Sequence, residues 1–230
     1  MHELIVGHSA IPGTVFGHFS SGTWNHIGKC GTEVLLALDV AILLPHWYQK
    51  HLVRLNAALL PPPEGFRFNH THLPHISLIQ QFTHENCLDE FTRETTALLR
   101  DVSPLEIRTA GFSHGRTTSV LRVSLTGPLM ELHTRLMDRL QYLDARSGNK
   151  SAFFFSQESP RLDDVTWVTH FRTRAAYEQF DPHITLGVGT MRGVIPPLHT
   201  NATHLAVCHL GRFCTCRHVL TDLTLTPNDA

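Results

Sequence analysis

Two short stretches of the chain repeat one combination of residue types that can move protons. Residues 74–78 are Pro-His-Ile-Ser-Leu, and residues 182–186 are Pro-His-Ile-Thr-Leu. In a β-strand, residues i and i+2 point to the same face. The histidine and the hydroxyl residue of each stretch are therefore expected to project together, while the isoleucine and the leucine point into a core.

An imidazole and a hydroxyl from each of two strands suit the cleavage of a phosphodiester. Of His75 and His183, one would take a proton from the attacking oxygen and the other would give a proton to the leaving oxygen. Ser77 and Thr185 would donate hydrogen bonds to the non-bridging oxygens, where negative charge builds up. Histidine suits both proton transfers because its unperturbed pKa lies near neutrality. This chemistry requires no metal ion.

A single His-x-Ser/Thr match would be weak evidence in a chain that contains 18 histidines. Two matches within the same five-residue frame are much stronger evidence. The alternative is that both histidines are strand residues with satisfied hydrogen bonds, and that the hydroxyl residues are ordinary, since threonine favours strands. The repeated offset between imidazole and hydroxyl favours catalysis.

The pattern resembles the 2H phosphoesterase superfamily, which is named for two His-x-Ser/Thr-x motifs in the two halves of one domain. Members include bacterial RNA 2',3'-cyclic phosphodiesterases, also called 2'-5' RNA ligases, and eukaryotic cyclic nucleotide phosphodiesterases. The resemblance covers roughly residues 34–226. It implies an α+β fold in which two pseudo-symmetric lobes of antiparallel sheet, with outer helices, surround a central cleft. In that fold His75 and His183 would be catalytic, and Ser77 and Thr185 would bind the substrate phosphate.

Other polar and aromatic residues near the motifs are weaker candidates for substrate binding. Tyr177 and Phe180 precede the second motif and are candidates for stacking on a base, with core packing as the alternative. Gln81 continues the two-residue alternation of the first motif, so it is preferred over Gln80. Phe112 is placed at the cleft rim, with an ordinary turn as the alternative. No arginine or lysine stands out as a phosphate ligand.

Apolar spacing predicts the elements that must position these residues. We expect strands over 34–44, 66–82, 105–112, 119–125, 165–169, 183–186, 204–211 and 213–225, and helices over 46–60, 86–99, 128–143 and 173–180. Residues 144–164 are expected to form a loop or insertion. Helices and strands do not alternate strictly, which argues against a doubly wound parallel sheet. The motif histidines at 75 and 183 are 108 residues apart, as an internal duplication would give. We expect residues 1–32 to form an irregular N-terminal arm and residues 33–230 a single bilobal domain.

Composition excludes several classes of function. The 230 residues are 42% hydrophobic and 17% charged, with a formal net charge of −1 and no long basic run. Binding of duplex nucleic acid through a large basic surface is therefore not expected. No stretch approaches the length of a membrane span, and no signal peptide is visible. The odd number of cysteines, five, favours a reducing compartment and hence the cytoplasm. A monomer is expected, because one cleft suffices.

One cluster of residues near the C-terminus has metal-ligand chemistry. It consists of Cys208, His209, Cys214, Cys216 and His218. Zinc sites usually use Cys-x2–4-Cys from a loop, whereas here the spacing is Cys-x-Cys within a strand pattern. Small buried thiols are the expected interpretation, so neither a metal nor a cofactor is predicted.

The sequence therefore predicts a metal-independent phosphodiesterase that acts on a nucleotide or an RNA end. The resemblance implies that the bond involves a ribose 2'-oxygen: a 2',3'-cyclic phosphate to hydrolyse, or a 2'-5' linkage to cleave or ligate, with a role in RNA processing. Which histidine is acid and which is base stays open. Two alternatives remain: a non-catalytic nucleotide- or RNA-binding module on the same fold, and a His/Cys-rich metal-binding protein.

Overall fold

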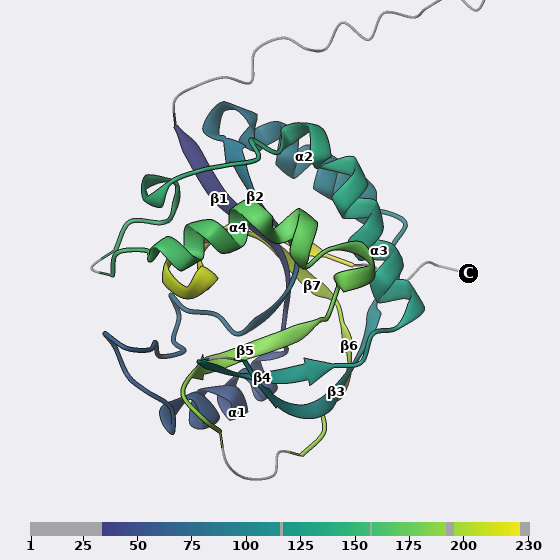
Figure 1. The fold of residues 1–230 in the computed structure, drawn as a ribbon. Helices are drawn as coiled ribbons and strands as arrows, with labels where there is room; N and C mark the ends of the chain where they lie inside the picture. The colour runs from purple at the N-terminus through teal and green to yellow at the C-terminus, as the bar shows by residue number, and fades with distance from the viewer. Residues whose placement is uncertain (1–33, 116, 157, 192–195, 226–230) are drawn as a thin grey trace, which may run out of the picture.

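The computed structural model describes residues 34–115, 117–156, 158–191 and 196–225, and Figure 1 shows their arrangement. The strands are β1 (Leu35–Leu43), β2 (His75–His84), β3 (Leu105–His114), β4 (Thr118–Val123), β5 (His183–Val188), β6 (His199–Ala202), β7 (His204–Leu210) and β8 (Cys216–Thr224). The helices are α1 (His46–Ala57), α2 (Leu88–Leu99), α3 (Gly127–Arg139) and α4 (Leu162–Arg174). Short 3-10 helices are η1 (Glu85–Cys87), η2 (Gln141–Leu143), η3 (Lys150–Ala152), η4 (Tyr177–Gln179) and η5 (Arg212–Cys214).

The strands form two antiparallel sheets of four strands each. Their orders are β2-β1-β7-β8 and β5-β4-β3-β6. The two motif strands, β2 and β5, each lie at an edge of their own sheet, and they contact one another. The α+β class predicted from the sequence is confirmed, and the two motifs occupy equivalent places in the two sheets. The predicted N-terminal arm lies outside the described residues, so its boundary with the domain stays a prediction.

The first sheet is built around β1, which has β2 on one side and β7 on the other. All residues from 37 to 42 are buried. A near-continuous apolar run is what a strand covered on both faces requires. The one charged residue in the run is Asp39, which is also fully buried. Helices α3 and α4 pack against β2 of this sheet, and Figure 1 shows α4 crossing it.

Helix α1 follows β1 in the chain but packs against β5 of the other sheet. The contact depends on Asn56, which is buried and whose side-chain amide donates to the carbonyls of Phe66 (3.0 Å) and Leu186 (2.7 Å). Its Oδ1 accepts a hydrogen bond from the backbone N–H of Phe68 at 2.9 Å. Gly187 permits the close approach: its φ is +147°, and a Cβ there would lie 3.0 Å from the Asn56 amide nitrogen. Asn56 thus ties α1 to the second motif strand.

The predicted strand over 165–169 is wrong, because these residues lie inside α4. The β-branched run there has strand propensity, but Val165, Val168 and Phe171 are buried at helical spacing. The side chain of Asp164 starts the helix by accepting the backbone N–H of Arg161 at 2.8 Å. The predicted helix over 173–180 is also wrong: it is divided between the end of α4 and η4.

Most other predicted elements are confirmed, with shifted ends. The strands expected over 34–44, 105–112, 119–125, 183–186, 204–211 and 213–225 correspond to β1, β3, β4, β5, β7 and β8, and the three remaining predicted helices correspond to α1, α2 and α3. The strand expected over 66–82 begins only at His75. Strand β6 was not predicted.

No helix in the described part of the chain is long and apolar enough to cross a bilayer.

We expect Asn56→Ala to lower the free energy of unfolding by about 2 kcal/mol, because the Leu186 carbonyl and the Phe68 N–H lose their bonds to Asn56 at roughly 1 kcal/mol each. The Phe66 carbonyl keeps a bond from the Arg67 guanidinium. Urea unfolding followed by circular dichroism measures the change. The matched control is Lys50→Ala, which alters an exposed position on the same helix. Equal stability of the two variants would show that α1 is held by apolar packing alone.

Candidate active site

The two motif histidines are held in the same way. His75 is the first residue of β2, and its Nδ1 lies 2.8 Å from the carbonyl oxygen of Leu73. His183 is the first residue of β5, and its Nδ1 lies 2.8 Å from the carbonyl oxygen of Asp181. A carbonyl can only accept, so Nδ1 carries the proton in each ring. This leaves Nε2 of both imidazoles as the nitrogen that can gain or lose a proton.

The proline before each histidine explains this shared geometry. Proline restricts the preceding residue to an extended conformation, which holds the carbonyls of Leu73 and Asp181 in the same relation to the following ring. Backbone bonds fix both segments further. The N–H of Leu73 donates to the carbonyl of Cys216 at 3.1 Å, and the carbonyl of Pro182 accepts from the N–H of Val123 at 2.9 Å. Each motif is thus anchored before its strand begins.

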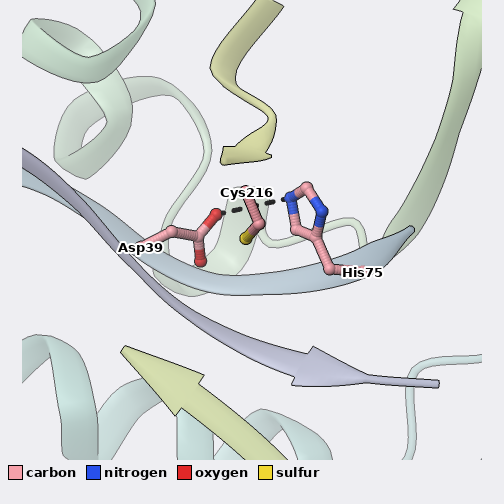
Figure 2. Close-up of side chains that lie close together, drawn as sticks. All are labelled: Asp39, His75 and Cys216. Atoms are coloured by element: carbon pink, nitrogen blue, oxygen red, sulfur yellow. Dashed lines mark ion pairs between the residues drawn. The ribbon is translucent and has the colours of Figure 1, made fainter. Parts of the chain in front are cut away.

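A buried carboxylate links the residues of the first motif. The hydroxyl of Ser77 donates to Oδ2 of Asp39 at 2.5 Å, and the amide of Gln80 donates to the same oxygen at 2.7 Å. Gln80 also donates to the Ser77 oxygen at 3.0 Å. Nε2 of His75 lies 3.6 Å from the same carboxylate oxygen, and Figure 2 shows the two side chains facing each other. Sequence reasoning missed Asp39, because it lies 36 residues before His75 in an apolar run.

Burial raises the pKa of the Asp39 carboxyl and is the largest influence on it. The charge of His75 and the hydrogen bonds from Ser77 and Gln80 act in the opposite direction. The other carboxylate oxygen, Oδ1, is buried and has no hydrogen-bond partner in the part of the chain that the structure describes. A buried charge without full compensation is costly. The Asp39 carboxyl therefore depends on the polar groups packed around it.

Gln80, and not Gln81, lies beside Asp39. The register between β1 and β2 skips Leu78, which is an extra residue on β2. Such a bulge shifts the alternation of side chains, and it reverses the faces that strict two-residue spacing assigned to the two glutamines. The amide of Gln81 is buried and donates instead to Oγ1 of Thr83 at 3.1 Å and to the carbonyl of Leu140 at 3.3 Å.

An exposed aromatic ring extends this network. The indole N–H of Trp167, on α4, donates to Oε1 of Gln80 at 2.9 Å. The Trp167 side chain is nevertheless 42% exposed. An aromatic face therefore stands at the surface two hydrogen bonds away from Ser77. The sequence pattern did not indicate a role for Trp167. The segment 165–169 was expected to be a strand, and only its position in α4 places the indole beside Gln80.

The aromatic residues singled out from the sequence are engaged elsewhere. The hydroxyl of Tyr177 donates to Asp138 at 2.8 Å, and the ring packs against the main core. Phe180 is buried and stacks on the ring of His133 with centroids 3.8 Å apart. Phe112, on β3, is half-buried and also packs against the main core. Tyr177 and Phe180 thus make the core contacts that the alternative expected, and substrate binding by Tyr177, Gln81 and Phe112 stays a prediction.

The second motif has a cation beside it. In the register between β4 and β5, Arg122 is opposite His183, so the two side chains share a face of the sheet. The guanidinium of Arg122 donates to the carboxylate of Asp181 at 2.7 Å and is half exposed. Thr185 lies two residues along β5 and is half-buried. Arg122 could not be identified as a neighbour of His183 from the sequence, because their proximity depends on the register between β4 and β5.

One buried histidine outside the motifs links the first motif strand to the segment that precedes the second. Nδ1 of His133, on α3, lies 2.6 Å from the carbonyl of Leu78 in the first motif, and Nε2 accepts the backbone N–H of Tyr177 at 2.9 Å. The ring is therefore the neutral Nδ1–H tautomer. Burial is the main cause that lowers the pKa of His133, and the charge of Arg172 acts in the same direction.

The five cysteine and histidine residues near the C-terminus, for which the sequence predicted no metal site, do not form a group of metal ligands among the described residues. Among the described residues, the group that comes together is Asp39, His75 and Cys216, which offer one ligand atom each within 4.8 Å of one another. Nε2 of His209 bonds to the backbone carbonyl of Ala152. Three described cysteines, Cys208, Cys214 and Cys216, are free thiols.

Comparison with known proteins agrees with this architecture. The model of the 2'-5' RNA ligase superfamily matches residues 49–205, a span that contains both motifs. TT0787 of Thermus thermophilus has a similar structure, with a TM-score of 0.51 and 16% identity over 84% of this chain and 100% of that chain. LigT of E. coli complexed with NADP+ has a TM-score of 0.50 and 17% identity over 84% of this chain and 99% of that chain. Among curated proteins, none matches.

We expect the stability contributed by His133 to depend on pH. Its pKa is lower in the folded protein than its ordinary value of 6.5, so the unfolded chain takes up the proton first as the pH falls. This contribution is therefore present above pH 6.5 and is lost as the pH falls below that value towards the folded pKa. The stability difference between wild type and His133→Gln, measured by urea unfolding, should shrink between about pH 7 and pH 5. A difference that does not change with pH would contradict a neutral, buried His133.

Proposed function

Because this chain belongs to the 2'-5' RNA ligase superfamily, we propose that it is a 2H-type phosphodiesterase that acts by general acid and base catalysis with His75 and His183. Its proposed substrates are nucleotides or RNA ends whose phosphodiester involves a ribose 2'-oxygen. The reaction is hydrolysis of a 2',3'-cyclic phosphate, or cleavage or formation of a 2'-5' linkage. Both motifs come from one chain, so the proposed site needs no second subunit.

The matching anchorage of the two imidazoles is the observation that carries this proposal. In each ring Nδ1–H donates to a backbone carbonyl two residues earlier. The neutral ring can therefore accept a proton at Nε2, and the charged ring can release one from Nε2, without breaking the anchoring bond. In hydrolysis one ring would remove a proton from water, and the other would protonate the departing ribose oxygen. The reverse direction exchanges the two roles.

The hydroxyls of Ser77 and Thr185 are proposed to donate to the non-bridging phosphate oxygens. Ser77 donates to Asp39 in the free protein, so its hydroxyl must rotate to reach a substrate. Gln80 would continue to donate to the carboxylate while this happens. Arg122, on the His183 face, is a cation that the second half of the site could offer to a phosphate. A nucleotide or RNA-end substrate implies a role in RNA processing, and the cytoplasmic location stays a prediction.

The decisive assay measures hydrolysis of 2',3'-cyclic nucleotides and of a 2'-5' linked dinucleotide, in the presence of EDTA. Loss of one proton-transfer group should lower the rate by about 10²–10⁴-fold. We expect this fall in both His75→Ala and His183→Ala, with His46→Ala, an exposed site on α1, as the control. Activity that survives either motif substitution would refute the two-histidine mechanism. A wild type that binds these compounds without turning them over would support the binding module.

The hydroxyl residues should matter for the rate more than for binding. We expect Ser77→Ala and Thr185→Val each to lower kcat by about 10²–10³-fold, as loss of a donor to developing charge does. Steady-state kinetics on the best substrate of the panel would separate kcat from KM. Ser113→Ala, a half-buried hydroxyl on β3, is the control. If only KM rises, the hydroxyls bind the ground state and do not stabilise the transition state.

A further inference from the structure

Three strands of the first sheet bring three different metal-binding groups to one place. Asp39 comes from β1, His75 from the start of β2 and Cys216 from the start of β8. A carboxylate oxygen, an imidazole nitrogen and a thiol sulfur lie within 4.8 Å of one another. Figure 2 shows the three side chains pointing toward one another.

We propose that Asp39, His75 and Cys216 form a binding site for Zn²⁺ that inhibits the enzyme when it is occupied. The metal would coordinate Nε2 of His75, which is the nitrogen that proton transfer requires. Inhibition therefore rests on the proposed function, whereas metal binding does not.

The distance between His75 and Asp39 is compatible with a metal ion between them. Nε2 of His75 is 3.6 Å from Oδ2 of Asp39, which is longer than a normal N–H···O bond of about 2.7–3.2 Å. Nitrogen and oxygen ligands lie about 2.0–2.1 Å from zinc in a tetrahedral site, and this places them roughly 3.4 Å apart. The Cys216 sulfur, whose bond to zinc would be about 2.3 Å, lies within 4.8 Å of both atoms.

The surroundings already provide the outer contacts that zinc ligands need. A histidine ligand almost always donates its other ring N–H to a carbonyl or carboxylate, and Nδ1 of His75 is bonded to the carbonyl of Leu73. A ligating carboxylate is itself hydrogen-bonded, and Oδ2 of Asp39 accepts from Ser77 and Gln80. Oδ1 of Asp39 is buried and lacks a hydrogen-bond partner within the described residues, so hydrogen bonds compensate the negative charge of the carboxylate only in part, and a cation at Oδ2 would add to that compensation.

The position of Cys216 follows from the backbone. Leu73, whose carbonyl anchors His75, donates its N–H to the carbonyl of Cys216. This pairing sets the thiol beside the motif. Cys216 forms one buried cluster with the small residues Ala41, Ala206 and Cys208. The His75 side chain is 11% exposed while that of Asp39 is fully buried, so the ion would arrive along the edge of the imidazole.

The ligand types select the metal. Nitrogen, oxygen and thiolate ligands together suit Zn²⁺, whereas Mg²⁺ and Ca²⁺ prefer oxygen alone. On binding, the thiol of Cys216 loses its proton to solvent, and the thiolate forms the bond to zinc. Three protein ligands and one water complete four-coordination.

Metal binding is tested by titrating the metal-free protein with ZnCl2 in a calorimeter, and with CoCl2 while recording the thiolate-to-cobalt absorption. We expect one zinc per chain and a thiolate band. Cys216→Ser should weaken zinc binding by at least about tenfold, the smallest loss seen even for outer contacts, and should abolish the band. Cys214→Ser, on a neighbouring thiol outside the cluster, should leave both unchanged. MgCl2 should give no binding heat.

Absence of one-to-one zinc binding, or equal affinity in wild type and Cys216→Ser, would overturn the site. If Cys216→Ser does not fold, as judged by circular dichroism, His75→Ala serves in its place and should weaken zinc binding by the same minimum.

Inhibition is measured separately, on the cyclic nucleotide hydrolysed in EDTA. The zinc concentration that halves the rate should match the calorimetric dissociation constant, and it should rise at least about tenfold in Cys216→Ser relative to that variant's own rate in EDTA. Zinc that binds at Cys216 but leaves the rate unchanged overturns the inhibitory role. A wild type inactive in EDTA defeats the proposed function, and the calorimetric result still decides the metal site.

Discussion

The first motif depends on one buried carboxylate. Asp39 lies in β1, an interior strand of its sheet, and has no exposed surface. Its Oδ2 accepts from Ser77 and Gln80 and faces His75. A charge in such a place is unfavourable unless it is compensated. The polar groups of β2 must therefore remain arranged around it. This arrangement sets the hydroxyl and the imidazole beside each other, and it leaves an oxygen and a neighbouring thiol that suit a metal ion.

The two halves of the site are alike in backbone and different in electrostatics. In both, a proline-histidine pair begins an edge strand and the carbonyl before the proline anchors the ring. The first half adds the buried Asp39, whereas the second has the half-exposed Arg122 opposite His183. An internal duplication, which the 108-residue spacing of the motif histidines led us to expect, would account for the likeness of the backbone. The different side chains would allow the two imidazoles to take unequal parts in one reaction.

Side-chain bonds from two helices help to hold the halves together. Asn56 ties α1 to β5, and His133 on α3 bonds to both the β2 backbone and the segment before β5. Both side chains are buried, so their bonds are shielded from water and costly to lose. The relative position of the two motif strands thus depends on a few polar contacts as well as on apolar packing.

The two motifs, the family resemblance and most of the elements could be predicted from the amino-acid sequence, because these depend on residue types at short spacing. It could not determine which glutamine faces the site, since one extra residue at Leu78 shifts the alternation only when β1 is paired beside it. It could not place Asp39 next to His75 or Cys216 next to both, because strand pairing brings together residues from distant parts of the chain. It also assigned a strand within α4, where burial of one helical face outweighed the strand propensity of β-branched residues. A short sequence motif shows which chemical groups lie close together along the chain, whereas the partners of a buried group depend on how distant strands pair in the folded protein.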